Sequence, residues 1–184
     1  MKNFFSLIKE SALELKNTIS LTVTAMLTAL YVVLHTFTTI VVSAIIEIRF
    51  SGVALAMIGS LYGPVVGGVA GAVGDVLKCL IRPTGSFFPG FTLNEFLRGF
   101  IYGAFLYKKQ PTLWRVMAAS FINALVVDFF LTPLWLTMMG LAQSAYPAML
   151  LARLPKVLVM FVVDTALTYG ALKLTKRVRI PKKA

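Results

Sequence analysis

Ionisable side chains stand inside apolar stretches of this sequence, where each of them needs a chemical reason. A charge within a bilayer is costly unless it is paired or hydrated. Glu95 and Arg98 are three residues apart, as are Arg153 and Lys156, so each pair occupies one face of a helix. Because arginine binds a carboxylate through two N–H groups and glutamate accepts from N–H groups, this set suits a ligand that carries both an acidic group and hydrogen-bond donors.

Further polar and aromatic residues are expected near the same outer ends of the helices. The candidate ligand-binding residues share either a charge, an amide or a ring that could face one pocket: Arg49, Asp75, Lys78, Phe88, Asn94, Glu95, Arg98, Trp135, Arg153 and Lys156. A structural interpretation stays open for some of them. Glu95 and Arg98 could form an internal ion pair, and Lys78 could extend to the outer interface. Arg153 and Lys156 favour the ligand, since no acidic residue stands beside them to neutralise two cations.

Asp128 and Asp164 lie near the middle of two apolar stretches. They could form a proton or sodium relay, as in coupled transporters. They could equally neutralise Lys156 or bond to neighbouring helices. No second feature of an ion site accompanies them, so we favour the structural role.

The elements that must position these residues are transmembrane helices. With 58% hydrophobic residues and a mean hydropathy of +0.84, the chain of 184 residues carries more apolar surface than one soluble core of its size could bury. Its apolar stretches approach the roughly 20 residues that cross a bilayer as a helix. We predict an all-α membrane protein, one domain over residues 1–184, with six spans near 19–38, 46–62, 64–81, 91–107, 112–139 and 147–174. The second span has few clean apolar residues, so a shorter helix is an alternative there.

The net charge of +11 fits membrane topology better than nucleic-acid binding, because the basic residues lie at helix ends. With six spans both termini share one side, and the lysines there make it cytoplasmic. Residues 1–18 are then a cytoplasmic amphipathic segment, and residues 175–184 are a basic cytoplasmic tail. The irregular stretch 84–90 falls outside, where Phe87 and Phe88 could cover an outward-facing pocket as a lid.

Small residues and the lone cysteine have packing roles as their first interpretation. The glycines between Gly67 and Gly74 favour close contact between helices inside the bundle. The spacing of Ala25 and Ala29 could serve internal packing or docking to another membrane subunit. Cys79 is expected to be a small packing residue. Nothing in the sequence resembles a nucleophile with its base, a phosphate-binding loop or a metal cluster, so we expect no enzyme, no bound cofactor and no ATP site in this chain.

Several motifs resemble the S components of energy-coupling factor (ECF) transporters, and among these the folate family. They are Glu47-Ile-Arg49-Phe50, Leu61-Tyr-Gly-Pro64, Gly71-Ala-Val-Gly-Asp75, the segment from Pro83 through Pro89-Gly-Phe-Thr-Leu93, and Ile101-Tyr-Gly103. Leu134-Trp-Leu136 and the segment from Ala152 to Lys156 also look like motifs of the family's fifth and sixth helices. The likeness covers residues from about 20 to 174.

The resemblance implies a six-helix vitamin-binding subunit in the plasma membrane of a prokaryote. It would capture its ligand from outside and dock, through Ala25 and Ala29, on a transmembrane coupling subunit that works with two ATPases. Asp128 to Pro133 departs from the pattern expected ahead of Leu134, and Glu95 and Arg98 stand where smaller residues are common. Pantothenate is therefore the nearest rival to folate. A solitary proton-coupled transporter that uses Asp128 and Asp164 is the alternative of another class, and a membrane enzyme or purely structural subunit is weaker.

Overall fold

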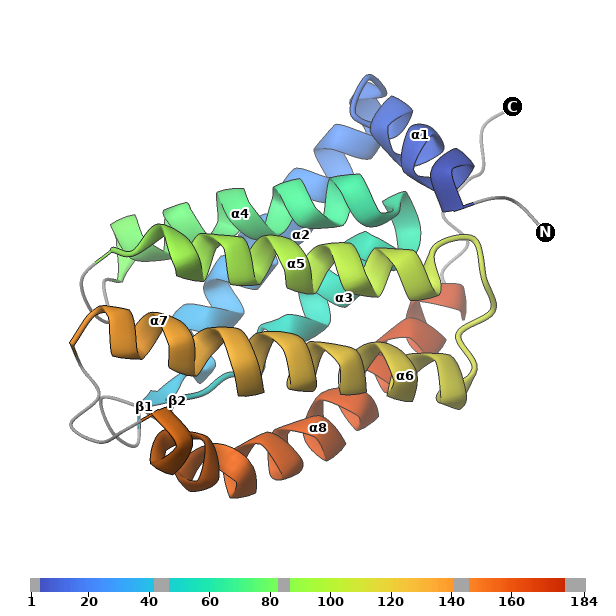
Figure 1. Cartoon of the computed structure of the whole chain (residues 1–184). Coiled ribbons are helices and arrows are strands. Elements are labelled where there is room, and N and C mark those ends of the chain that lie inside the picture. The colour runs from blue at the N-terminus through green and yellow to red at the C-terminus, as the bar shows by residue number, and fades with distance from the viewer. Residues whose placement is uncertain (1–3, 42–46, 83–86, 141–145, 178–184) are drawn as a thin grey trace.

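Helices make up almost all of the structure, a computed structural model that describes residues 4–41, 47–82, 87–140 and 146–177. In chain order the elements are α1 (Phe4–Glu14), α2 (Thr18–Thr38), β1 (Ile40–Val41), β2 (Glu47–Ile48), α3 (Gly52–Tyr62), α4 (Pro64–Ile81), α5 (Pro89–Leu106), α6 (Leu113–Asn123), η1 (Ala124–Leu131), α7 (Thr132–Met138) and α8 (Tyr146–Arg177). Figure 1 shows α4 and α5 side by side, with α6 and α7 in one line below them and α8 beneath. The small β1–β2 pair lies at the end opposite α1.

Five of the predicted spans coincide with helices to within about two residues at most ends. Four helical stretches of the described chain are long and apolar enough to cross a membrane: Thr18–Thr38, Pro64–Ile81, Leu113–Met138 and Arg153–Thr175. α5 has 18 residues, as α4 does, but it carries Asn94, Glu95 and Arg98. The chain is thus an all-α membrane protein with a bundle of helices around these polar groups.

The prediction of a span over 46–62 is wrong in its first part, and the shorter alternative is what forms. Residues 47–48 pair with β1 as antiparallel backbone, with Ile40 opposite Ile48 and Val41 opposite Glu47. The helix α3 begins only at Gly52 and has 11 residues. The backbone N–H and C=O groups of an extended pair are bonded across strands, so the same residues cannot also form helical turns.

Glycines bring α3, α4 and α5 into direct backbone contact, as the sequence predicts for the run that begins at Gly67. A Cβ on Gly99 would lie 2.0 Å from the carbonyl oxygen of Gly67, and one on Gly59 would lie 2.7 Å from the amide nitrogen of Gly103. Both distances are too short for a side chain. Close backbone approach is a common way for helices to associate in lipid, where the hydrophobic effect contributes little.

The long rod formed by α6, η1 and α7 contains eight residues of π-helix, Ala124–Leu131. A π-helix bonds residue i to i+5 and is rare, usually appearing as a short insertion in an α-helix. At its end the carbonyl of Val127 accepts the backbone N–H of Thr132 and also the Thr132 hydroxyl, at 2.7 Å. Asp128 lies in this widened turn, which was not foreseen from the sequence.

The N-terminal helix α1 packs against the turn between α3 and α4. The Ser11 hydroxyl donates to the carbonyl of Tyr62 at 2.8 Å and accepts from the backbone N–H of Val65 at 3.0 Å. It therefore satisfies N–H groups that the start of α4 would otherwise leave unpaired. α1 and the last turns of α8 lie at the same end of the molecule (Figure 1).

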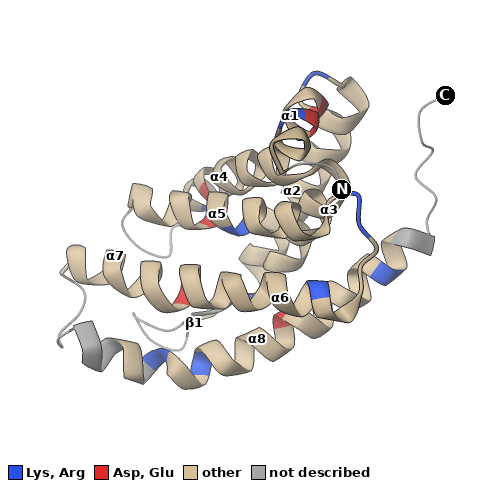
Figure 2. Cartoon of the chain, turned by 45° about the vertical axis from the view of Figure 1, so that its right-hand side comes forward, with Lys and Arg blue, Asp and Glu red and all other residues tan. Residues whose placement is uncertain are grey.

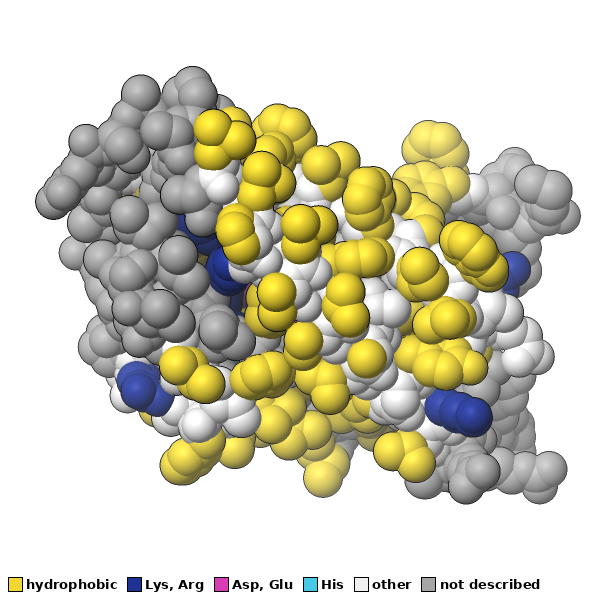
Figure 3. All heavy atoms as spheres, turned by 90° about the horizontal axis from the view of Figure 1, so that it is seen from below, with side chains coloured by type: hydrophobic (Ala, Val, Ile, Leu, Met, Phe, Trp, Pro, Cys, Tyr) yellow, Lys and Arg dark blue, Asp and Glu magenta, His cyan; other side chains and the backbone are white. Residues whose placement is uncertain are grey.

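The outer surface is apolar over the middle of the bundle. Figure 3 shows hydrophobic side chains across one broad face, with Lys and Arg towards its two ends. On α8 the exposed residues include Leu151, Leu158, Val159 and Val162. This distribution matches the lipid core and its two polar interfaces. Ala25 and Ala29 also lie on the exposed side of α2, so internal packing does not account for them.

Candidate functional site

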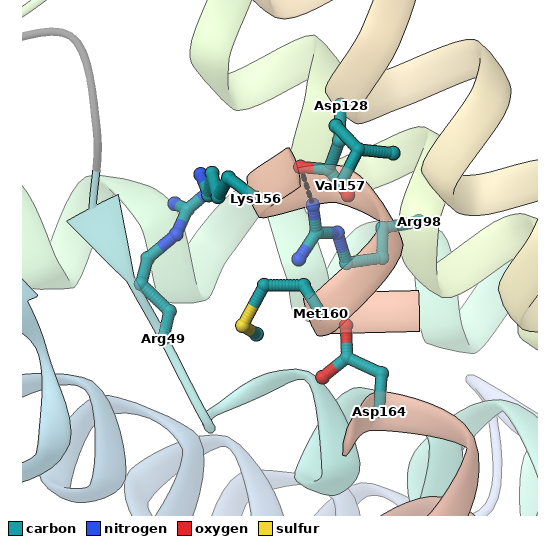
Figure 4. Close-up of a pocket in the computed structure, with 7 residues that line it drawn as sticks. All are labelled: Arg49, Arg98, Asp128, Lys156, Val157, Met160 and Asp164. Carbon is teal, nitrogen blue, oxygen red and sulfur yellow. Dashed lines mark hydrogen bonds and ion pairs between the residues drawn. The ribbon is translucent and has the colours of Figure 1, made fainter. Parts of the chain in front are cut away.

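A small cavity lies among the charged residues in the interior of the bundle. It is lined by Arg49, Arg98, Asp128, Lys156, Val157, Met160 and Asp164. Arg49 follows β2, Arg98 comes from α5, Asp128 from the π-helix η1, and the remaining residues from α8 (Figure 4). The cavity offers about 10 Å³ to the centre of a water molecule, which is room for about one. Charged residues are otherwise sparse along the middle of the helices (Figure 2).

Arg98 and Asp128 form the best-defined ion pair of the cavity wall. An Arg98 Nη2 group donates to Asp128 Oδ1 at 2.8 Å, and both side chains are largely buried. The sequence suggested Lys156 as one partner of Asp128, but the carboxylate lies against Arg98 instead. A charge-assisted bond of this length in a region of low dielectric fixes both side chains.

Glu95 does not line the cavity, but its carboxylate lies close to three cations. Its carboxylate is 3.2 Å from Arg49, 3.7 Å from Lys78 and 4.0 Å from Arg98. Glu95 is 3% exposed, so this charge has little water to stabilise it. The predicted Glu95–Arg98 pair is therefore part of a larger network that also orients two residues of the cavity wall.

Lys78 belongs to this network and does not extend to the interface. It is 4% exposed, and its ammonium lies 3.1 Å from Asp75 and 4.9 Å from the centre of the Tyr31 ring. Asp75 also accepts a hydrogen bond from the Thr92 hydroxyl at 2.8 Å. Both residues were predicted to touch a ligand, but in this structure their polar atoms contact other side chains.

Lys156 and Arg49 point toward one another in the cavity (Figure 4). Arg49 and Arg153 both repel the Lys156 ammonium electrostatically, and Asp128 attracts it. No carboxylate among the described residues lies within ion-pair distance of Lys156. Three cations and two carboxylates line the cavity, so an acidic guest placed between Lys156 and Arg49 would lower the repulsion.

Arg153 and Asp164 differ from their predicted places. Arg153 is buried, at 2% exposure, but it is not part of the cavity lining, although Lys156 one turn later is. Asp164, which the sequence analysis assigned to a structural role, contributes to the cavity floor, and its charge attracts that of Arg98.

Aromatic residues form a cluster around Phe88, at the start of α5. The ring of Phe88 lies 5.7 Å from that of Trp135 and 6.1 Å from that of Phe91, measured between ring centres. The indole N–H of Trp135 donates to Asn94 Oδ1 at 3.0 Å, and Asn94 Nδ2 donates to the Thr132 hydroxyl at 3.1 Å. Phe87 is exposed. Residues 83–86, which include the start of the predicted lid, lie outside the described residues.

Sequence reasoning missed Thr132, Val157, Met160 and Tyr31 as members or neighbours of this site. Each is an uncharged residue within a long apolar stretch, where its type carries no signal of a site. The visible irregularities inside predicted spans were Pro133, next to Thr132, and Pro155, two residues before Val157.

A charged cavity among the helices of a membrane protein is typical of proteins that bind a small polar ligand. Consistent with this class, residues 20–173 match the family model of the substrate-specific component of ECF transporters. The chain belongs to this family, whose members are substrate-binding components of transporters and not enzymes.

Similar proteins of the family carry folate in their names. The folate transporter FolT of Clostridium novyi is 37% identical over 139 residues, which cover 76% of this chain and 80% of that protein. The folate transporter FolT of Leuconostoc mesenteroides is 32% identical over 149 residues, covering 79% of this chain and 80% of that protein. A crystal structure of FolT bound with folic acid superimposes with a TM-score of 0.78 at 34% identity, covering 86% of this chain and 95% of that one.

Proposed function

We propose that this chain is the folate-binding S component of an ECF transporter. The observation that carries the proposal is the approach of Lys156 to Arg49 in a charged cavity. The Phe88–Trp135 ring pair is bonded, through the Trp135 indole, to Asn94, which lies about one turn before Arg98 on α5. Folate unites an acidic tail with a flat ring that carries donors and acceptors, so these two surfaces suit its two ends. The similarity to FolT proteins supports the same ligand.

Of the predicted residues, Arg49, Arg98 and Lys156 are assigned to the acidic groups of the ligand, and Phe88 and Trp135 to its ring. Asn94, whose Oδ1 accepts from the Trp135 indole in this structure, is assigned to donors of the ligand ring. Glu95, Asp75, Lys78 and Arg153 then act mainly by holding the binding residues in place, since the first three contact each other or their neighbours. The cavity has room for only about one water molecule, so its walls must separate when a vitamin enters.

The topology assigned to the chain has six membrane spans. They are α2, α3, α4, α5, the α6–η1–α7 rod and α8, with α3 too short to cross the whole bilayer by itself. Lys108 and Lys109 lie at the same end as α1, where Lys108 pairs with Glu10, so this end is placed on the cytoplasmic side of a prokaryotic plasma membrane. The start of α5 lies at the other end of the bundle and would then face outward (Figure 1). The lid over 84–90 stays a prediction.

The chain would take its energy from partners. A transmembrane coupling subunit and two ATPases would bind and hydrolyse ATP, and Ala25 and Ala29 on the exposed side of α2 would form the docking surface. Asp128 in its ion pair with Arg98 supports a structural role for this carboxylate over a proton relay.

A titration of the purified protein with folic acid and with pantothenate tests the proposal. We expect tight binding of folic acid, and Lys156→Met should weaken it about tenfold to a hundredfold, because a hydrogen bond to a charged group contributes roughly 1.5–3 kcal/mol. Lys173→Met is the matched control, since Lys173 is exposed on the same helix.

Preference for pantothenate would change the vitamin that we propose and leave the class of protein unchanged. Binding of neither vitamin would reject the proposal. Uptake into liposomes by this chain alone, driven by a proton gradient, would favour the solitary transporter.

A further inference from the structure

The π-helical turn in the α6–η1–α7 rod has a side chain that holds it in place. In this turn Val127 is 1% exposed, and its carbonyl accepts two hydrogen bonds from one residue, the backbone N–H and the hydroxyl of Thr132. Thr132 is itself 7% exposed. Because the turn bonds i to i+5, it displaces Asp128 from the direction that it would have in a regular α-helix.

The same hydroxyl also links the rod to α5. Thr132 Oγ1 accepts a hydrogen bond from Asn94 Nδ2 at 3.1 Å. One turn away on both helices, Arg98 of α5 donates to Asp128 of the rod at 2.8 Å. The two contacts form neighbouring rungs between facing helices. A shift of one contact therefore also shifts the other, since both contacts join the same two helices one turn apart.

A third bond extends this arrangement to the aromatic residues. Trp135 donates its indole N–H to Asn94 Oδ1, and its ring packs on Phe88. A continuous hydrogen-bonded path therefore joins the Val127 carbonyl, Thr132, Asn94 and Trp135. Deleting the Thr132 hydroxyl would remove the acceptor of Asn94 and a donor of the π-helical turn at once.

We propose that Thr132 is a positioning residue for the ligand site, whose hydroxyl holds the π-helical turn that presents Asp128 to Arg98 and ties it, through Asn94, to Trp135. This inference rests on the proposed function in that the positioned residues bind the ligand. Thr132 does not line the cavity itself, so it acts through Asp128 and Asn94. The substitution Thr132→Val keeps the shape of the side chain and removes only the hydroxyl.

The chain offers a matched control in Thr137 on the same rod. Its hydroxyl donates to the carbonyls of Pro133 and Leu134, at 3.1 and 2.7 Å, and among the described residues it has no partner on another helix. Thr137→Val therefore removes a hydroxyl that bonds to its own helix backbone, but it removes no hydrogen bond to α5. Thr132→Ser, which keeps the hydroxyl, should restore what Thr132→Val loses.

Tryptophan fluorescence reports on the path directly. The chain has two tryptophans, and Trp114 is exposed at the start of α6, so Trp114→Phe leaves Trp135 as the single tryptophan emitter. In this background and without ligand, Thr132→Val should shift the emission of Trp135, while Thr132→Ser and Thr137→Val should not. In titrations with folic acid, Thr132→Val should bind at least tenfold more weakly, Thr132→Ser within about threefold of the parent and Thr137→Val unchanged.

A double-mutant cycle separates positioning from plain loss of stability. Because the hydroxyl acts through Asp128 as well as Asn94, Thr132→Val should weaken binding by a smaller factor in an Asp128→Asn background than in the parent, whereas independent effects would multiply. Effects that multiply, or a Thr132→Val protein that matches Thr137→Val in both emission and affinity, would overturn the proposal.

If the parent binds no folic acid, the proposed function fails. The emission without ligand still decides whether Thr132 holds Trp135. Thr132→Ala replaces Thr132→Val if the latter does not fold.

Discussion

Glu95 is the residue on which the charges of the interior converge. Arg49, Lys78 and Arg98 come from three separate segments and all lie within 4.0 Å of its carboxylate. Removing one buried member of such a network leaves the remaining charges with less compensation, and breaking a buried ion pair in this way is in general strongly destabilising. Glu95 is therefore expected to matter for folding as well as for the shape of the cavity.

At the residue scale we predict that Glu95→Gln destabilises the protein by about 3–5 kcal/mol, because it leaves the buried Lys78 and Arg98 and the partly buried Arg49 around a neutral group. Glu10→Gln is the matched change at the surface, where Glu10 pairs with the partly exposed Lys108. It should cost less than about 1 kcal/mol. Thermal unfolding of both variants in the same detergent measures the difference. Equal unfolding temperatures would show that the buried network does not stabilise the fold.

At the element scale the contacts between α4 and α5 depend on absent side chains. The backbone oxygen of Gly67 and the Cα of Gly99 approach so closely that the helices could not keep their positions if either residue carried a Cβ. Arg98 and Glu95 are on α5, and Lys78 and Asp75 are on α4. The distance between these two helices therefore also decides whether the charge network can form.

The prediction for this junction compares two glycines. Gly99→Ala should destabilise the protein by about 1–3 kcal/mol or more, because the added methyl group would overlap the Gly67 backbone. Gly170→Ala on α8 meets nothing within 4 Å and should be neutral or stabilise by up to about 1 kcal/mol through its helix propensity. Unfolding temperatures of the two variants test this. A Gly99→Ala protein as stable as the parent would mean that α4 and α5 can separate without loss.

At the scale of the whole molecule the apolar outer surface has two tasks, contact with lipid and contact with partner subunits. Ala25 and Ala29 are small and exposed on α2, whereas most of the exposed apolar residues are large. Small residues permit another helix to approach closely in the membrane. This contrast supports the proposal that their face receives the coupling subunit.

We expect Ala25→Trp and Ala29→Trp to abolish transport and to leave ligand binding intact, because the bulky ring blocks the approach of another helix. Val162→Trp, on the exposed side of α8, is the control for adding a tryptophan to the lipid-facing surface. Co-purification with the coupling subunit and a binding titration separate the two effects. Assembly of both alanine variants at the level of the parent would show that docking uses another surface.

Hydropathy and composition by themselves determined that the chain is a helical membrane protein, and they located five of its helices closely. This works because a bilayer demands long apolar helices whatever their neighbours are. The residue types also predicted that charged residues gather inside the bundle, and Arg49, Lys78 and Arg98 do meet at Glu95. Their binding to a ligand stays a prediction. The length of the span predicted over 46–62 was overestimated. The β1–β2 pair that shortens it to α3 depends on residues from two separate segments.

Only the tertiary structure decided which charges meet. Arg98 and Asp128 are 30 residues apart and Arg49 and Glu95 are 46 apart, so their pairing depends on how the helices are packed and rotated. Two further features also depend on the tertiary structure: the π-helical turn that ends at Thr132, and the burial of Arg153 outside the cavity lining. Periodicity assigns a residue to a face of its own helix. The partner of that face is set by the glycine contacts and hydrogen bonds between helices, which no single stretch of sequence contains.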